Sequence, residues 1–243
     1  MPAVLLLGAS SDMAIAIARK FAQDKYDIIL AGRNVQQLSE FKTDLEIRYN
    51  VKAEAVKFDA LDYASHPSFY NNLPFHPDIT ICIFGYLGDQ QKAVTDWNEA
   101  ENIIQSNFTG AVSILNIVAE DYKQKKSGII AGISSVAGER GRQSNYIYGS
   151  AKAGFTAYLS GLRNSLSKFG VHVITVLPGF VYTKMTADLT LPPSLTATPE
   201  QVASAVKKAV HKKQNVIYVK WMWRWIMFTI KSIPEGVFKK LKL

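Results

Sequence analysis

Short, continuous apolar runs alternate with longer segments of helical spacing over most of this chain, and this order is the strongest constraint on its fold. Strands that are apolar at every position are typical of parallel sheets covered by helices on both faces. Seven such runs are predicted strands, at residues 3–7, 27–31, 53–58, 79–84, 128–133, 171–177 and 216–219. Helical periodicity separates them, at residues 13–23, 36–49, 95–123, 148–169 and 199–211. We therefore predict an α/β fold, a single doubly wound Rossmann domain with a seven-stranded parallel sheet and helices on both faces.

The length and composition fit one domain of this kind. The 243 residues are 48% hydrophobic and 20% charged, which supplies a full core and excludes a disordered chain. We expect the Rossmann domain to occupy residues 1–219 and an amphipathic tail to occupy residues 220–243. Cys82 is the single cysteine and the four histidines are far apart, so we expect no disulfide and no metal site. The first residues lack the pattern of a signal peptide, so we expect a cytoplasmic protein.

The turn between the first strand and the first helix is a candidate phosphate-binding site. A strand that turns into a helix directs backbone N–H groups at a ligand, and such turns in dinucleotide-binding folds are rich in glycine. Here only Gly8 remains, and the later glycine positions hold Asp12 and Ala14. Asp12 is alternatively an N-cap of its own helix, and a carboxylate here must point away from a phosphate. The predicted cofactor contacts in this turn are Gly8, Ser10, Ser11, Asp12 and Met13.

Two further positions bear on the cofactor. NAD-binding folds usually carry an acid at the end of the second strand for the ribose 2′-hydroxyl, whereas this chain has Gly32 followed by Arg33. A guanidinium suits a 2′-phosphate, so we predict NADP rather than NAD, with an exposed turn arginine as the alternative. Asp59 ends the third strand, where it is placed to bond the adenine amine.

A catalytic pattern lies in the second half of the chain. Tyr148 and Lys152 are four residues apart on a predicted helix and therefore share a face. A nearby ammonium favours the phenolate and lowers the pKa of the tyrosine toward the working pH. Ser135 follows the fifth strand, at the sheet edge where open α/β folds bind ligands, and its hydroxyl is placed to hold a substrate carbonyl.

The order and spacing of these residues resemble the short-chain dehydrogenase/reductase family over about residues 3–215. The match includes the Gly8 turn, Ser-Asn-Phe-Thr-Gly around Asn107, and Leu-Pro-Gly-Phe-Val-Tyr-Thr from residue 177. The resemblance implies a catalytic tetrad in which Tyr148 donates the proton, Lys152 holds the nicotinamide ribose and tunes Tyr148, Ser135 orients the carbonyl and Asn107 supports a water relay. It also implies that Thr183 holds the carboxamide. The remaining implied cofactor contacts are Phe84, Gly85, Tyr148, Lys152, Pro178, Gly179 and Val181.

Two departures from the family pattern resemble one of its branches. The glycine-rich turn is reduced to Gly8, and the segment after the fourth strand reads Phe-Gly-Tyr-Leu-Gly-Asp from Phe84 to Asp89. Both features, and the tryptophan-rich basic C-terminus, are similar to the reductase subunits of decaprenylphosphoryl-ribose 2′-epimerase. That resemblance implies reduction of a keto-pentose carried on a polyprenyl phosphate, with a separate oxidase as partner. We also expect a homo-oligomer.

The tail is unusual in composition. Three of the four tryptophans lie in it, and its six basic residues against one acid from residue 216 onward give +5 of the net +8. Lys220, Arg224 and Lys231 fall on one side of a predicted helix whose remaining surface is apolar, and the run is too short to span a bilayer. An interfacial helix on the inner face of a membrane fits this pattern, and packing on the domain or on a partner subunit is the alternative. Residues 232–235 resemble a capping box that begins a second short helix.

These observations lead to one principal hypothesis and two alternatives. We predict an NADP(H)-dependent oxidoreductase that interconverts a carbonyl and a secondary alcohol on a small molecule or a polyprenyl-linked sugar. The alternatives are a generic lipid or steroid keto-reductase, and a nucleotide-sensing protein that keeps the fold without catalysis. The basic tail is interleaved with large aliphatic residues, so we expect no nucleic-acid partner.

Overall fold

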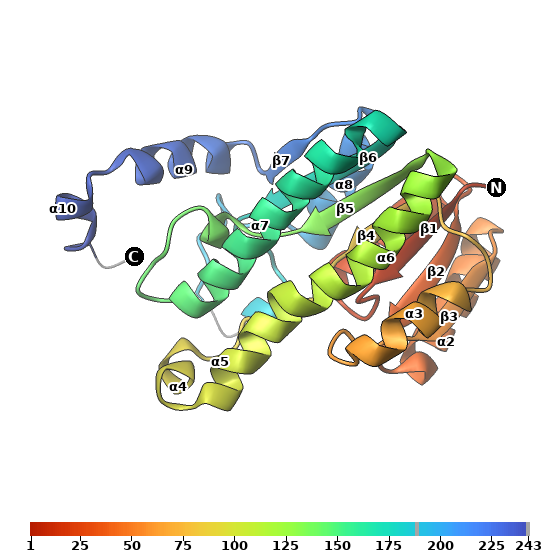
Figure 1. The fold of residues 1–243 in the computed structure, drawn as a ribbon, viewed down its shortest axis with the longest axis horizontal. Helices are drawn as coiled ribbons and strands as arrows, with labels where there is room; N and C mark the ends of the chain where they lie inside the picture. The colour runs from red at the N-terminus through yellow and green to blue at the C-terminus, as the bar shows by residue number, and fades with distance from the viewer. Residues whose placement is uncertain (188–189, 242–243) are drawn as a thin grey trace.

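The computed structural model describes residues 1–187 and 190–241 and confirms the predicted sheet (Figure 1). All seven strands are parallel, in the order β3-β2-β1-β4-β5-β6-β7, so the direction of winding reverses between β1 and β4. The predicted strand limits agree with the observed ones to within one or two residues. The strands are β1 (Ala3–Leu7), β2 (Asp27–Gly32), β3 (Ala53–Lys57), β4 (Ile79–Cys82), β5 (Gly128–Ile133), β6 (Val171–Pro178) and β7 (Val216–Val219).

Helices cover both faces of the sheet, and successive strand residues supply the two cores. Val4 and Leu6 of β1 pack in the core under α1, α2 and α8, whereas Leu5 and Leu7 pack in the core under α3, α6 and α7. This alternation explains why a strand with two covered faces has no polar position. The helices are α1 (Asp12–Ala22), α2 (Val35–Tyr49), α3 (His66–Asn71), α4 (Gln90–Thr95), α5 (Trp97–Ile104), α6 (Gly110–Lys125), α7 (Tyr146–Leu166), α8 (Pro199–His211), α9 (Met222–Ser232) and α10 (Glu235–Phe238).

The helical prediction is incomplete between β3 and β5. Two observed helices were not predicted, namely α3, which has only six residues, and α4, whose N-cap is Asp89. The predicted helix over 95–123 is divided, because Asp96 caps a new start and a π-helical turn at Gln105–Thr109 separates α5 from α6. In this turn the side-chain amide of Asn107 donates to the carbonyl of Ile103 at 2.8 Å. π-helical turns occur often at functional sites, and this one sets the position of Asn107.

The tail packs against the domain along one face of α9. Trp223 and Met227 are buried there in a small core with Val136 and Leu177, and the indole N–H of Trp223 donates to the carbonyl of Leu195 at 3.0 Å. A Cβ added to Gly179 would lie 1.9 Å from the Trp223 ring, so the tail can dock only against a glycine.

Arg140 fixes the end of the same helix. Its guanidinium donates to the carbonyls of Ile230 and Ile233, forms an ion pair with Glu235 at 3.0 Å and lies 3.7 Å from the centre of the Phe238 ring. The carbonyls at a helix C-terminus attract cations, which makes Arg140 a clamp between the loop after β5 and the tail.

Two details of the predicted tail are wrong. Lys220 precedes α9 in a left-handed conformation and bonds the carbonyl of Ser194 at 2.7 Å, so it does not share the helix face of Arg224. Residues 232–235 do not form a capping box, because Ser232 donates back to the carbonyl of Phe228 and α10 begins after Pro234 without a side-chain cap. In both cases a backbone carbonyl nearby competes successfully for the side chain.

We predict that two of the three tail tryptophans, Trp223 and Trp225, differ sharply in their effect on stability. Trp223→Ala removes a fully packed ring and should lower the free energy of unfolding by about 3–5 kcal/mol. Trp225→Ala is the matched control, because that ring is 61% exposed, and it should change stability by less than about 0.5 kcal/mol. Urea unfolding followed by circular dichroism measures both, and equal midpoints for the two variants would show that α9 is not docked in solution.

Candidate functional site

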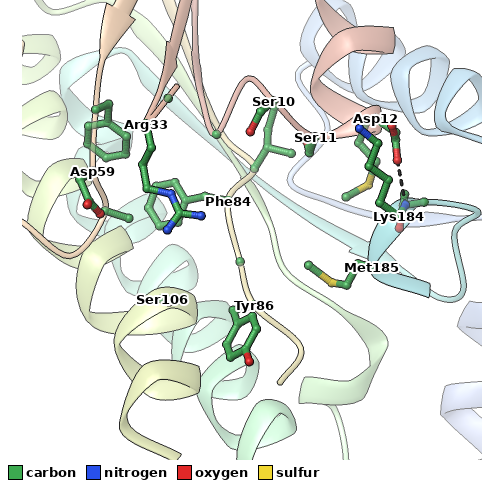
Figure 2. Close-up of a pocket in the computed structure, with 18 of the residues that line it drawn as sticks. Ser10, Ser11, Asp12, Arg33, Asp59, Phe84, Tyr86, Ser106, Lys184 and Met185 are labelled. Carbon is green, nitrogen blue, oxygen red and sulfur yellow. Dashed lines mark hydrogen bonds between the residues drawn. The ribbon is translucent and has the colours of Figure 1, made fainter. Parts of the chain in front are cut away.

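A cleft of about 520 Å³ lies where the strand order reverses, at the carboxyl ends of β1, β2 and β4. Open α/β sheets bind ligands at such a switch point, because the loops on either side of it diverge and leave a crevice. Figure 2 shows Ser10 and Ser11 in the middle of the cleft, Arg33, Asp59 and Phe84 on one side, and Lys184 and Met185 on the other. The predicted cofactor contacts that line this cleft are Gly8, Ser10, Ser11, Asp12, Met13, Arg33, Asp59, Phe84, Gly85 and Thr183.

Gly8 allows the first turn to approach the neighbouring strand. Its φ is +94°, and an added Cβ would lie 2.7 Å from the backbone nitrogen of Phe84, so no other residue fits without displacing the start of the loop after β4. The side chain of Ser11 then caps α1 by accepting from the backbone N–H of Ala14 at 3.1 Å. One glycine is therefore enough to make a close turn into a helix N-terminus.

Asp12 has a different role from the N-cap considered for it. Ser11 is the N-cap, and the Asp12 carboxylate instead accepts the backbone N–H of Lys184 at 2.9 Å (Figure 2). This bond joins the turn after β1 to the loop after β6, which closes the other side of the cleft. It also draws the negative charge toward Lys184, as a phosphate-binding turn requires.

Arg33 and Asp59 lie on the wall formed by β2 and β3. Arg33 is exposed and both residues line the cleft, so the guanidinium can approach a ligand without losing an existing partner. One carboxylate oxygen of Asp59 accepts the backbone N–H of Leu61 at 3.0 Å, which fixes the loop after β3. The adenine contact of Asp59 stays a prediction.

A second cavity, of about 150 Å³, continues from the cleft and contains the candidate catalytic groups. Its lining includes Ser135, Tyr148 and Lys152, and the two cavities share Met13 and Gly85, among other residues. The predicted contacts Pro178, Gly179, Val181 and Thr183 also line it. The structure thus brings together residues that the sequence separates by 170 positions or more.

Asn107 lies behind this cavity and holds its floor. Its side-chain amide donates to the carbonyl of Tyr86 at 2.6 Å and its oxygen accepts the backbone N–H of the same residue at 3.3 Å. The side chain is buried, and it is not part of the lining of either cavity. Asn107 therefore positions the loop after β4, and its predicted part in a water relay stays a prediction.

Lys152 is buried, and its ammonium donates to the carbonyl of Ile133 at 3.1 Å. Ser134 reinforces this placement, because its hydroxyl donates to the backbone carbonyl of Lys152 at 2.9 Å and so ties α7 to β5. The ammonium nitrogen is 5.8 Å from the centre of the Tyr148 ring. These contacts fix both ends of the lysine side chain beside the phenol.

The pKa values differ from the expected pattern in one respect. Burial raises the pKa of Tyr148 to about 12, and the neighbouring Ser135 hydroxyl only partly offsets this rise. Burial also lowers the pKa of Lys152 to about 8, while Cys82 acts in the opposite direction. The expectation that the tyrosine pKa falls is therefore wrong here, because desolvation of the phenolate exceeds the attraction of an ammonium several ångströms away. A phenol that keeps its proton at neutral pH is suited to donate it.

Several residues that line the two cavities were not predicted from the sequence. Tyr86, Lys184 and Met185 line the cleft, and Arg142, Asn145 and Trp223 line the catalytic cavity. Most lie in loops whose course no periodicity reveals. For the tail surface that includes Trp223, the sequence left open membrane contact or packing on the domain, and the structure packs the Trp223 ring on Gly179.

Comparison with known proteins gives the family. The sequence model of the short chain dehydrogenase family matches residues 2–193 of this chain. An uncharacterised oxidoreductase of Mycobacterium tuberculosis is 34% identical over 241 residues, covering 98% of this chain and 96% of its own length. The chain belongs to the short-chain dehydrogenase family, as the resemblance implied, and is an oxidoreductase of that class.

One further relative and one solved structure extend the comparison. An NADP-dependent 3-hydroxy acid dehydrogenase of Schizosaccharomyces pombe is 27% identical over 229 residues and covers 88% of each chain. The solved structure of a short-chain dehydrogenase from Sphingobium yanoikuyae in complex with NADPH superposes with a TM-score of 0.85, at 24% identity, over 97% of this chain and 98% of that one. This similarity confirms the fold over nearly the whole chain.

Proposed function

We propose that the protein is an NADP(H)-dependent carbonyl reductase that also oxidises the corresponding secondary alcohol. The observation that carries the proposal is the joined pair of cavities, with Gly8 and Arg33 in one and Ser135, Tyr148 and Lys152 in the other. The turn at Gly8 has no room for a Cβ and leads into a helix N-terminus, which suits a pyrophosphate. The solvent-accessible guanidinium of Arg33 suits a 2′-phosphate. Two of the relatives above are described as binding or depending on NADP.

The proposed mechanism assigns one task to each side chain. The bound cofactor supplies a hydride to the carbonyl carbon. Ser135 donates a hydrogen bond to the carbonyl oxygen, and Tyr148 transfers its phenolic proton to the same oxygen, which becomes the alcohol. Lys152 holds positive charge beside the phenolate that forms and so offsets its burial. Alcohol oxidation runs through the same steps in reverse.

Tyr148→Phe should lower the rate of NADPH-dependent reduction by about 10²–10⁴-fold, because it removes the proton donor and keeps the ring.

In the native protein, reduction should decline as pH rises through about 8, where Lys152 loses its charge while Tyr148 keeps its proton. Initial rates of NADPH oxidation with a panel of ketones measure both effects. NADPH binding to the variant, followed by fluorescence, is the control. A fully active phenylalanine variant, or a rate that rises above pH 8, contradicts the assignment.

Arg33→Ala should weaken binding of NADPH and leave binding of NADH nearly unchanged, because the two cofactors differ only in the 2′-phosphate. Charge-assisted hydrogen bonds contribute roughly 1.5–3 kcal/mol, so the affinity ratio should shift by about 10–100-fold. Titration of each cofactor gives the ratio directly. An equal loss for both would assign Arg33 to structure.

For the substrate, we propose a keto-pentose linked to a polyprenyl phosphate, with a separate oxidase that supplies the ketone. The tail supports this choice. Trp221, Trp225 and Phe228 form a stripe on the outer face of α9 that is more than half exposed, and Arg224 and Lys231 lie exposed beside it. No helix in the described residues is long and apolar enough to cross a membrane, so contact through this stripe would be peripheral. A lipid-linked sugar stays at the membrane. The opposite face of α9 lines the catalytic cavity through Trp223, so the same helix would contact both the membrane and the cavity.

A lipid or steroid ketone is the second candidate substrate. The catalytic cavity is lined by large apolar side chains, among them Leu87, Phe180 and Met185, which suit such a molecule. Rates with a polyprenyl-phosphoryl keto-pentose and with a steroid ketone, measured side by side, decide between the two. A protein that binds NADPH and turns over neither is the nucleotide-sensing alternative.

The membrane proposal predicts binding to vesicles of phosphatidylglycerol and phosphatidylcholine that weakens with salt. Each basic residue close to an anionic surface adds about 1 kcal/mol, and the stripe adds apolar burial. The combined variant Trp221→Ser, Trp225→Ser and Phe228→Ser should lose sedimentation with vesicles. Trp97→Ser is the control, because that ring is 67% exposed but lies outside the tail. Native protein that stays in the supernatant at low salt would favour a second copy of the chain as the occupant of the stripe, which size-exclusion chromatography tests.

A further inference from the structure

Arg142 is a half-buried cation in the catalytic cavity that the mechanism does not use. It lies in the loop between β5 and α7 and lines the cavity together with Ser135 and Tyr148. One terminal nitrogen of its guanidinium is 3.4 Å from the carbonyl of Val136, the residue after Ser135, and 3.8 Å from the sulfur of Met227 on α9. The guanidinium is therefore held beside the catalytic serine by the docked tail.

The guanidinium of Arg142 lacks the partners that its burial calls for. Its Nε is buried and has no hydrogen-bond partner among the described residues, and its contacts to Val136 and Met227 are long. A buried polar group without a partner costs free energy, and a charged one costs more, so such a group beside a cavity is suited to bind a ligand, an ion or an ordered water there. The side-chain oxygen of Asn145, three residues further on in the same lining, is also buried without a partner.

The nearby acid, Glu139, forms no ion pair or hydrogen bond with Arg142 in the described part of the chain, and its Oε2 is itself buried without a partner. Glu139 is the carboxylate that acts on Arg142, but one of its oxygens already accepts from Lys231 at 2.9 Å and from the hydroxyl of Tyr218 at 2.9 Å. The cavity therefore carries a half-buried guanidinium that has no ion pair among the described residues, and this favours a negatively charged ligand.

We propose that Arg142 binds an anionic group of the substrate, a phosphate ester or a carboxylate, and that Asn145 accepts a hydroxyl of the same molecule. The proposal rests on the proposed carbonyl reduction, because it names the kind of substrate that this cavity receives. The anion would lie on the cavity wall that also carries Ser135, so its place is within a few bonds of the reacting carbonyl. A planar guanidinium binds either anion through two parallel hydrogen bonds, which orients the ketone as well as holding it. A keto-sugar with a phosphate on the neighbouring carbon has this form, whereas a neutral steroid ketone does not.

The test compares matched charged and neutral ketones as substrates of the full chain with NADPH. Dihydroxyacetone phosphate and dihydroxyacetone form the phosphate pair, and 3-oxobutanoate and its methyl ester form the carboxylate pair. Arg142→Gln should lower kcat/KM for the preferred anion by about 10–100-fold and change the neutral partner by no more than about twofold. Arg142→Lys keeps the charge, and its kcat/KM for the preferred anion should lie between the values of the native protein and of Arg142→Gln. Arg48→Gln removes one exposed positive charge from α2 outside the cavity, and it should leave all four rates unchanged.

Binding of inorganic phosphate provides a readout that needs no turnover. Calorimetric titration of the NADP-saturated native protein with inorganic phosphate should reveal a single phosphate site. Arg142→Gln should remove this site, and Tyr148→Phe should keep it. If Arg142→Gln lowers the rates of charged and neutral ketones equally, or if the native protein shows neither phosphate binding nor any preference for an anionic ketone, the proposal is overturned. If phosphate binding depends on Arg142 while no ketone is reduced, the anion site stands and the proposed carbonyl reduction fails.

Discussion

The candidate site depends on one contact, the approach of the turn at Gly8 to the start of the loop after β4. The strand order reverses between β1 and β4, so the two loops at this point leave in opposite directions and a crevice opens between them. Gly8 lets the β1 loop lie against Phe84 without a side chain in between. From this point the cofactor cleft extends toward Arg33, and the catalytic cavity extends toward Tyr148. A bulkier residue at position 8 would force apart the two strands on which both cavities rest.

Each group at the site is held by a second group from a distant part of the chain. Asp12 ties the first turn to Lys184 after β6, Asn107 fixes the loop at Tyr86, and Ser134 joins α7 to β5. The bonds of Asn107 and Ser134 are partly or fully buried, where an unmade hydrogen bond costs more than it does in water, whereas the bond of Asp12 is exposed. Their combined effect is a site whose geometry is set by the scaffold before any ligand arrives. Proton transfer benefits from such a site, because donor and acceptor need no rearrangement.

The tail joins the architecture of the site to its chemistry. Its inner face completes the catalytic cavity through Trp223 and brings Met227 against Arg142, while its outer face presents exposed aromatic and basic side chains. One short helix thus takes part both in the proposed choice of substrate and in the proposed contact with a surface. A tail that acted only as a membrane anchor would have no need of the glycine at position 179 or of the clamp formed by Arg140.

The sequence by itself determined the fold class, the strand positions, the family and the order of the candidate catalytic residues. Buried strands, helix periodicity and the Tyr148–Lys152 spacing are local patterns, so each can be recognised without knowledge of its neighbours. Only the tertiary structure decided where the helix breaks near Asn107, that Asp12 bonds the loop after β6, how the pKa of Tyr148 shifts, and that Arg142 lines the cavity. These properties depend on which carbonyls, cations and apolar groups other segments bring into contact, and on how much water those contacts exclude. Sequence spacing carries no record of such contacts, because the residues that make them lie tens of positions apart along the chain.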